Sequence, residues 1–147
     1  MNSWHPERDQ AGAAAAFAAT TALIVDDEAH VRSYLRLVLR TLGVITMWEA
    51  ADGREALELY EAHRPTVVLL DVSMPVMGGD EMMRKLTAID PDAVVIVVTS
   101  QNDYEIVKRF VRLGATSYVL KHLPREEIAE MIADVLLRLG QGAEEEA

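Results

Sequence analysis

The sequence predicts an α/β fold in which a parallel sheet carries helices on both faces. From Thr21 onward, short apolar runs of strand length alternate with segments whose apolar residues recur at helical spacing. The apolar runs are continuous rather than alternating, which is typical of strands buried on both faces. The chain has 147 residues, half of them hydrophobic, which suffices for one domain with one core.

Three strands and two helices are expected between Thr21 and Asp71. The strands are the apolar runs Ala22 to Val25, Val44 to Trp48 and Thr66 to Asp71. The first helix has an apolar stripe closed by Gly43, and the stripe consists of Val31, Tyr34, Leu35, Val38 and Leu42. The second helix begins at the Asp52-Gly53 turn and runs through Tyr60, with Ala56, Leu57 and Tyr60 facing inward.

Three helices and two strands are expected after Asp71. A loop containing Pro75, Gly78 and Gly79 should come first, because these residues favour turns. The elements that follow are a helix from Asp80 to Ile89, a strand from Ala93 to Val98, a helix from Asn102 or Asp103 to Leu113, a strand from Ser117 to Leu120 and a helix from Pro124 to Leu139. The strand from Ala93 to Val98 is the most apolar and is expected to be central.

The two ends of the chain are expected to lie outside this body. Residues 1–20 should form a flexible or short helical arm, residues 21–140 the domain, and residues 141–147 an acidic disordered tail.

Composition argues against several classes of protein. The formal charge is −10, which is unfavourable for a protein that binds the phosphate backbone of nucleic acids. No apolar run approaches the roughly 20 residues of a membrane-spanning helix. The chain has no cysteine, which excludes disulfides and thiolate metal sites and suits a cytoplasmic protein.

Polar residues stand at the carboxyl ends of four of the five predicted strands. They are Asp26 and Asp27, Asp71, Thr99 and Lys121. The carboxyl ends of parallel strands share one edge of the sheet, so these side chains should converge. Three neighbouring carboxylates repel one another unless a hard cation such as Mg²⁺ binds them, and a lysine and a hydroxyl could hold phosphate oxygens. This pattern predicts a magnesium-assisted aspartyl-phosphate site with Asp71 as the nucleophile.

These residues resemble the receiver domains of two-component response regulators. The resemblance rests on the Asp26-Asp27 pair, on Asp71 within Asp-x-x-Met-Pro-x-Met-x-Gly, on Thr99, and on Lys121 after Gly-Ala-x-x-Tyr-x-x. It covers the chain from about Thr21 to Leu139. It implies a flavodoxin-like (CheY-like) doubly wound fold of five parallel strands in the order 2-1-3-4-5, with five helices.

The resemblance also implies a role for each residue of the site. Asp27 and Asp71 would bind Mg²⁺ directly, Asp26 mainly through water, and Ser73 through its backbone carbonyl. Asp71 would accept a phosphoryl group from the phosphohistidine of a sensor histidine kinase or a phosphotransfer protein. Lys121 would pair with the phosphate.

Four further positions carry regulatory roles in the family. Thr99 would report phosphorylation, and Tyr118 corresponds to the aromatic switch residue. Ser73 and Gln101 match the positions that tune how fast water removes the phosphoryl group.

The sequence departs from the family pattern after Lys121. Receiver domains usually have proline there, often in a cis peptide bond, whereas this chain has His122 and places Pro124 later. A cis bond before histidine would cost about 3 kcal/mol, so a trans bond is expected. A catalytic role for His122 is the less favoured alternative to that of a solvated turn residue.

The expected function is that of a stand-alone signalling module, not an enzyme beyond its own phosphorylation and dephosphorylation. It would be a monomer or weak dimer that contacts a downstream protein through the fourth helix, fifth strand and fifth helix of the domain. A phosphorelay shuttle and a regulator of a separate enzyme remain open. An aspartyl-phosphate phosphatase would need an aspartate where Ser73 stands, and a flavin carrier a hydroxyl-rich loop in place of Asp26-Asp27-Glu28.

Overall fold

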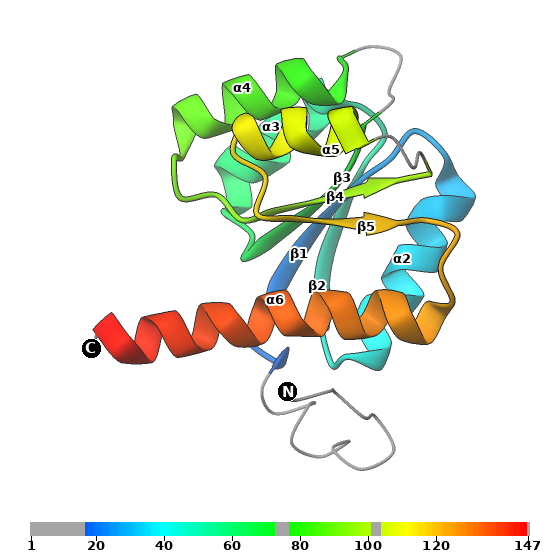
Figure 1. Ribbon diagram of the computed structural model, residues 1–147, viewed down its shortest axis with the longest axis vertical. Coiled ribbons are helices and arrows are strands. Elements are labelled where there is room, and N and C mark those ends of the chain that lie inside the picture. The colour runs from blue at the N-terminus through cyan, green and yellow to red at the C-terminus, as the bar shows by residue number, and fades with distance from the viewer. Residues whose placement is uncertain (1–16, 73–76, 101–103, 147) are drawn as a thin grey trace.

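The computed structural model describes residues 17–72, 77–100 and 104–146, in which five strands alternate with five helices (Figure 1). The strands are β1 (Thr21–Val25), β2 (Thr46–Ala50), β3 (Val67–Asp71), β4 (Val95–Thr99) and β5 (Ser117–Leu120). The helices are α2 (Ala29–Thr41), α3 (Gly53–His63), α4 (Gly79–Ile89), α5 (Tyr104–Arg112) and α6 (Arg125–Glu146). All strand pairs are parallel and the order is β2-β1-β3-β4-β5, which confirms the predicted topology.

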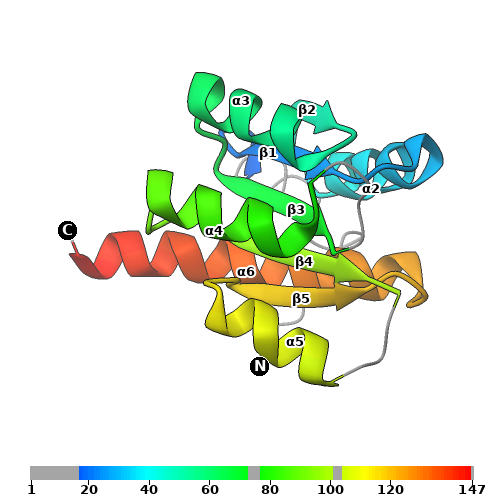
Figure 2. The same ribbon diagram turned by 90° about the horizontal axis from the view of Figure 1, so that it is seen from above.

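Helices cover both faces of the sheet, and each face has its own apolar core. Helices α2 and α6 pack on one face and α3, α4 and α5 on the other, as Figures 1 and 2 show. Every residue of β3 and β4 is buried, because both strands lie inside the sheet with helices above and below. The middle strand is β3, and β4 lies between β3 and β5, close to the central position expected for it.

Residues at the helix ends explain where α2, α3 and α5 begin or end. The side chain of Asp52 accepts a hydrogen bond from the N–H of Glu55 at 2.9 Å, which caps the start of α3. Gly43 and Gly114 have φ angles of 101° and 112°, a backbone conformation that glycine adopts at little cost. Both glycines therefore end their helices as the sequence predicted.

The second strand begins later than predicted. It spans Thr46–Ala50 instead of Val44 to Trp48. The N–H of Val44 donates to the carbonyl of Leu39 at 3.1 Å, so Val44 belongs to the turn that closes α2. Val44 is buried beneath that turn, and its apolar character reflects this burial rather than a place in the sheet.

Helix α6 extends beyond its predicted end at Leu139 and continues to Glu146. The prediction of a disordered tail is therefore wrong for residues 141–146. Gly140 and Gly142 each disfavour a helix by about 1 kcal/mol relative to alanine. However, Ala143 and the three glutamates that follow it are good helix formers, and the preceding turns of α6 already nucleate the helix. Although α6 has 22 residues, neither it nor another helix in the described part of the chain has the apolar length to cross a bilayer.

Phe17 contributes to the core from outside the predicted domain. Residues 1–16 of the predicted arm lie outside the described residues, but Phe17 is only 3% exposed and belongs to the cluster on the α2 and α6 face. Phe17 thus packs into this core four residues before Thr21, where the domain was predicted to begin.

We expect Phe17→Ala to destabilise the protein by about 3 kcal/mol, because it deletes a buried aromatic ring and leaves a cavity. Urea denaturation followed by circular dichroism measures this loss. Tyr104→Ala is the matched control, since Tyr104 is 68% exposed and its truncation should cost less than about 0.5 kcal/mol. Equal stability of the two variants would contradict the role of Phe17 in the core.

Candidate functional site

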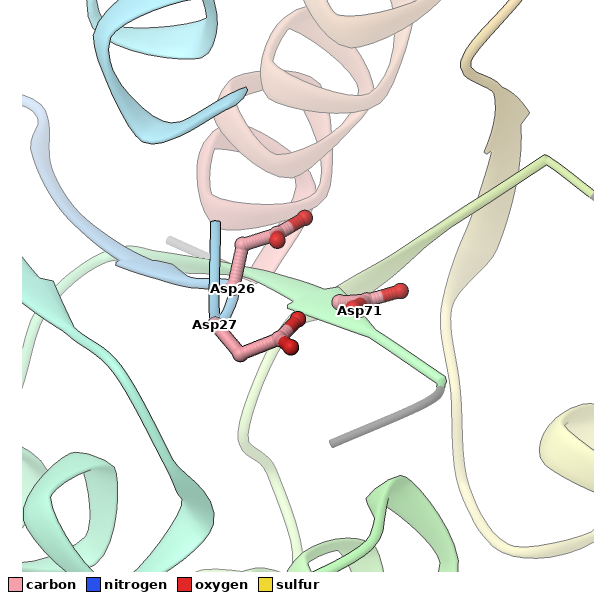
Figure 3. A group of neighbouring side chains, drawn as sticks. All are labelled: Asp26, Asp27 and Asp71. Atoms are coloured by element: carbon pink, nitrogen blue, oxygen red, sulfur yellow. The ribbon is translucent and has the colours of Figure 1, made fainter. Parts of the chain in front are cut away.

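Three carboxylates meet at the carboxyl ends of β1 and β3. Asp26 and Asp27 directly follow β1, and Asp71 is the last residue of β3. The two strands pair with Val25 opposite Leu70, so the residues that follow are neighbours. One oxygen from each carboxylate lies within 4.8 Å of the other two, and Figure 3 shows the three side chains beside one another. The structure therefore brings together the aspartates that the strand order predicted to converge.

Two of the three carboxylates are withdrawn from water. Asp26 has no exposed surface and Asp71 is 5% exposed, whereas Asp27 lies at the surface. A buried carboxylate is costly unless hydrogen bonds or opposite charges compensate it. Asp26 Oδ1 accepts the N–H of Glu28 at 3.0 Å, but Asp26 Oδ2 accepts no hydrogen bond of good geometry from the described residues.

Lys121 places an ammonium group between the two buried aspartates. It follows β5 and donates its backbone N–H to the carbonyl of Thr99 at 2.8 Å, which ties it to the end of β4. Its Nζ lies 3.0 Å from Asp26 Oδ2 and 3.3 Å from Asp71 Oδ1. The contact with Asp71 is a hydrogen bond, and the contact with Asp26 is an ion pair.

The surroundings of Lys121 keep it charged. Burial lowers its pKa, but the contacts with Asp26 and Asp71 and their negative charges raise it by more. The net pKa lies above the ordinary value of 10.5, so Lys121 is an ammonium ion at neutral pH.

The donor set fits a hard divalent cation. Three carboxylates share the cluster with the single ammonium group of Lys121. Mg²⁺ is typically bound by one or two carboxylates together with several waters. Oxygens spaced within 4.8 Å, and a buried Oδ2 of Asp26 that lacks a hydrogen bond, match this requirement.

A cavity of about 230 Å³ lies beside the carboxylates. It is lined by Asp27, Glu28, Asp71, Val72, Thr99, Ser100 and Lys121. Thr99 is 1% exposed and belongs to β4, which carries its side chain to the same edge as Asp71. One small space is thus bordered by a carboxylate, a hydroxyl and an ammonium group.

Other predicted site residues lie elsewhere. Ser73 and Gln101 lie outside the described residues. Tyr118 is 38% exposed on β5 and does not line the cavity. His122 is exposed, and no cis peptide bond occurs in the described parts of the chain, so the expected trans bond before His122 is confirmed.

Sequence reasoning missed two residues of this region. It gave no role to Arg32, whose Nη1 donates to the backbone carbonyl of Asp26 at 2.7 Å. It also gave no role to Glu28, which lines the cavity. An arginine near the start of α2 was an available signal, because the helix dipole disfavours positive charge there unless another contact compensates it.

The sequence of residues 22–133 matches the family described as the response regulator receiver domain. Among curated proteins, the chain is similar to protein CcdB of Bacillus subtilis, with 34% identity over 117 residues, covering 80% of this chain and 98% of that protein. It is also similar to sporulation initiation phosphotransferase F of Bacillus subtilis, with 32% identity over 114 residues, covering 78% of this chain and 91% of the relative.

The fold also resembles that of a chain in a solved complex. A chain of the crystal structure of the CheX-CheY-BeF3-Mg²⁺ complex from Borrelia burgdorferi aligns with a TM-score of 0.75 and 29% identity, covering 79% of this chain and 88% of that one. That complex contains both a divalent cation and beryllofluoride.

Proposed function

The chain belongs to the response regulator receiver domain family, and from this premise we propose that it signals by carrying a phosphoryl group on Asp71. Receiver domains of the CheY type are signalling proteins rather than enzymes in the usual sense. The observation that carries the proposal is the position of Lys121 Nζ, which lies within 3.3 Å of both Asp26 and Asp71 beside a small cavity. A phosphoryl group on Asp71 would find an ammonium group within reach.

The chemistry follows from the groups around the cavity. A carboxylate oxygen of Asp71 attacks the phosphorus of a phosphohistidine, the P–N bond breaks, and the imidazole leaves as its nitrogen takes up a proton. The ammonium of Lys121 attracts the phosphate oxygens, and the buried hydroxyl of Thr99 can donate to one of them. A bound Mg²⁺ would supply positive charge that offsets the repulsion between an anionic donor and three carboxylates. Asp26, Asp27 and Asp71 would hold it, with the carbonyl of Ser73 as a further ligand.

The proposed donor is a sensor histidine kinase or a histidine-containing phosphotransfer protein, and the proposed output is contact with another protein. The alternative is a relay shuttle that passes the phosphoryl group to a second histidine. The similarity to a sporulation phosphotransferase along 91% of that protein's length favours keeping this alternative. Transfer of the phosphoryl group from the phosphorylated protein to a histidine-containing phosphotransfer protein would distinguish a relay shuttle from a regulator that acts by contact with another protein.

Labelling with acetyl phosphate tests the proposal directly. The protein should take up phosphate only with Mg²⁺ present, and hydroxylamine should release it, because an aspartyl phosphate is a reactive acyl phosphate. A label resistant to hydroxylamine would indicate a hydroxyl acceptor and would contradict the proposal.

The proposed output surface is the face formed by α5, β5 and α6. Thr99 and Tyr118 are linked through the sheet, because Val97 of β4 pairs with Tyr118 and Thr99 with Leu120. Movement of the Thr99 hydroxyl toward a phosphate oxygen would shift the end of β4 and the space beside β5. Tyr118, now 38% exposed, could then change between outward and inward positions. The outward position and the exposed Tyr104 and Val111 would give partners a recognisable shape.

We expect Thr99→Ala to accept phosphate but to lose most of the conformational response. The hydroxyl is not the nucleophile, yet it is the group placed to couple the phosphate to β4. Backbone NMR shifts on adding beryllofluoride and Mg²⁺ should spread from Asp71 to Tyr118 and the α5-β5-α6 face in the parent protein, and stay near Asp71 in the variant.

Thr87→Ala is the matched control, because the hydroxyl of Thr87 donates within its own helix, to the carbonyls of Met83 at 2.9 Å and Arg84 at 3.2 Å. It should show the parental shift pattern. An unchanged pattern in Thr99→Ala would show that Thr99 does not couple the site to the output face.

A further inference from the structure

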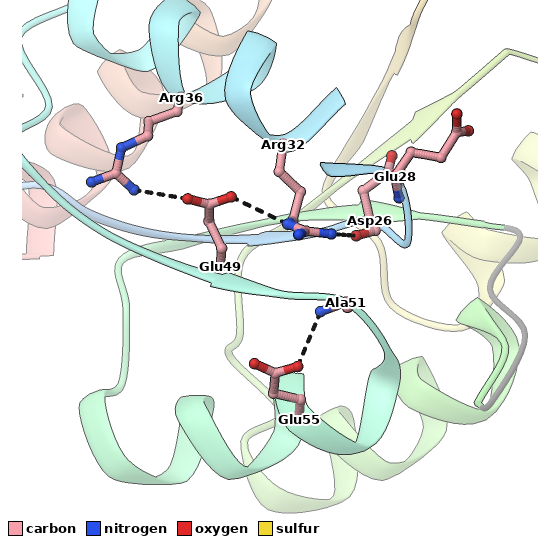
Figure 4. A network of polar contacts seen from close by, with 7 residues as sticks. All are labelled: Asp26, Glu28, Arg32, Arg36, Glu49, Ala51 and Glu55. Atoms are coloured by element: carbon pink, nitrogen blue, oxygen red, sulfur yellow. Dashed lines mark hydrogen bonds and ion pairs between the residues drawn. The ribbon is translucent and has the colours of Figure 1, made fainter. Parts of the chain in front are cut away.

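Arg32 connects the carboxylate cluster to the edge strand β2. Its Nη1 donates to the backbone carbonyl of Asp26 at 2.7 Å, and its Nε pairs with Glu49 Oε1 at 3.2 Å. Figure 4 shows the guanidinium between these two groups. Both contacts lie in a setting of limited solvent access, since the Arg32 side chain is 18% exposed. The planar fork of arginine allows two nitrogens to serve two acceptors at once.

Glu49 is itself held by a second arginine. Arg36, one helical turn after Arg32 on α2, places Nη1 3.1 Å from Glu49 Oε2 (Figure 4). Each oxygen of Glu49 therefore faces one guanidinium, which fixes the carboxylate that orients Arg32. The two arginines share Glu49 as a partner, but the hydrogen bond to the Asp26 carbonyl comes from Arg32.

The backbone of Asp26 is held at both of its peptide groups. Its N–H donates to the carbonyl of Ala50 on β2 at 3.1 Å, and its carbonyl accepts from Arg32. Its side-chain Oδ1 accepts the N–H of Glu28. These contacts leave Oδ2 directed to Lys121 Nζ at 3.0 Å. The position of Asp26, and of Asp27 next to it, thus depends on a contact made from α2.

We propose that Arg32 is a positioning residue that holds the Asp26-Asp27 turn in the geometry needed to bind a divalent cation. The inference rests on the proposed function for the cation's role in phosphorylation. Arg32 acts through the Asp26 carbonyl and does not itself touch the bound ion or the phosphoryl group. Groups that orient metal ligands typically change metal affinity by about 10- to 100-fold when removed.

Charge repulsion alone predicts the opposite change in Mg²⁺ affinity when Arg32 is replaced. Arg32 is a cation near the cluster, so removing its charge should tighten Mg²⁺ binding if simple repulsion were its only effect. If positioning dominates, removing it weakens binding. Arg36 carries the same charge in the same network without reaching Asp26, so it separates the two effects.

The experiment compares Arg32→Gln with Arg36→Gln by titrating Mg²⁺ into the full chain in a calorimeter. We expect about 10-fold weaker binding in Arg32→Gln and a change of less than about 2-fold in Arg36→Gln. Unchanged or tighter binding in Arg32→Gln, or equal weakening in both variants, would overturn the proposal. Should Arg32→Gln fail to fold, Arg32→Lys replaces it, because a single ammonium lacks the fork that reaches both Asp26 and Glu49.

A readout without metal separates this inference from the proposed function. Amide hydrogen exchange at Asp26 and Glu28 should accelerate about 10-fold in metal-free Arg32→Gln and stay at the parental rate in Arg36→Gln. If the parent bound no Mg²⁺, the proposed function would fail while this exchange pattern would still support the positioning contact. If the amides of Asp26 and Glu28 in Arg32→Gln exchanged at the parental rate, the positioning role of Arg32 would be contradicted, regardless of the Mg²⁺ affinities.

Discussion

Asp71→Asn is expected to abolish labelling of the protein by radiolabelled acetyl phosphate, with a rate at least about 1,000-fold below that of the parent. Asparagine keeps nearly the size and shape of the side chain but has no anionic oxygen to attack phosphorus. Asp71 is 5% exposed, lies beside the cavity and forms a hydrogen bond with Lys121, so this position combines burial with access to an incoming group. Labelling should also vanish in the parent when EDTA removes Mg²⁺.

Asp92→Asn is the control for this loss. Asp92 is an exposed aspartate in the turn after α4, away from the cavity, and its substitution should leave labelling unchanged. Circular dichroism should show both variants folded, because removing one of three clustered carboxylates relieves repulsion at the site. Labelling of Asp71→Asn at the parental rate would rule out Asp71 as the acceptor.

Lys121→Met is expected to destabilise the protein by about 3 kcal/mol in EDTA, because it leaves the buried carboxylates of Asp26 and Asp71 without their ammonium partner. Urea denaturation measures the loss. Added Mg²⁺ should recover part of it, since a cation bound to the folded state supplies positive charge in the same place.

The matched control is Lys85→Met at an exposed ion pair. Lys85 lies 3.2 Å from Glu81 with both side chains about half exposed, and such a pair contributes less than about 1 kcal/mol. A loss of stability in Lys121→Met no larger than in Lys85→Met would contradict the view that Lys121 compensates buried charge.

The ion pairs of Lys121 with Asp26 and Asp71 also make the stability of the protein depend on pH in the alkaline range. Burial lowers the pKa of Lys121, but the contacts with Asp26 and Asp71 raise it by more. The pKa of Lys121 in the folded protein therefore lies above 10.5. The resulting stabilisation is fully present at a pH below the pKa of Lys121 in the unfolded chain. It is lost as the pH rises through the pKa of Lys121 in the folded protein. The difference in stability between parent and Lys121→Met should therefore be constant up to about pH 10 and shrink above it.

Much of the fold could be predicted because strand burial leaves a clear signal. The runs that became β3 and β4 are apolar at nearly every position, as two-sided burial requires. The start of β2 was misplaced because Val44 is apolar for a different reason, namely packing beneath the end of α2. Phe17 was missed because a single aromatic residue among alanines has no periodicity to reveal its partner.

The site could be predicted in part for a similar reason. Parallel strands bring their ends to one edge, so Asp26, Asp71 and Lys121 could be grouped from topology alone. The contact of Arg32 could not be predicted, although a positive charge near the start of α2 marks this residue, because sequence patterns do not record a side chain that reaches back to a backbone carbonyl.

Mapping the modified residue tests the central claim most directly. The protein is incubated with acetyl phosphate and Mg²⁺, reduced with borohydride, digested and examined by mass spectrometry. Borohydride converts an aspartyl phosphate to homoserine, so the account predicts homoserine at position 71 in the Mg²⁺ sample and unmodified aspartate there in the EDTA sample. Homoserine at another aspartate, or an unmodified Asp71 in a sample that had taken up phosphate, would contradict it.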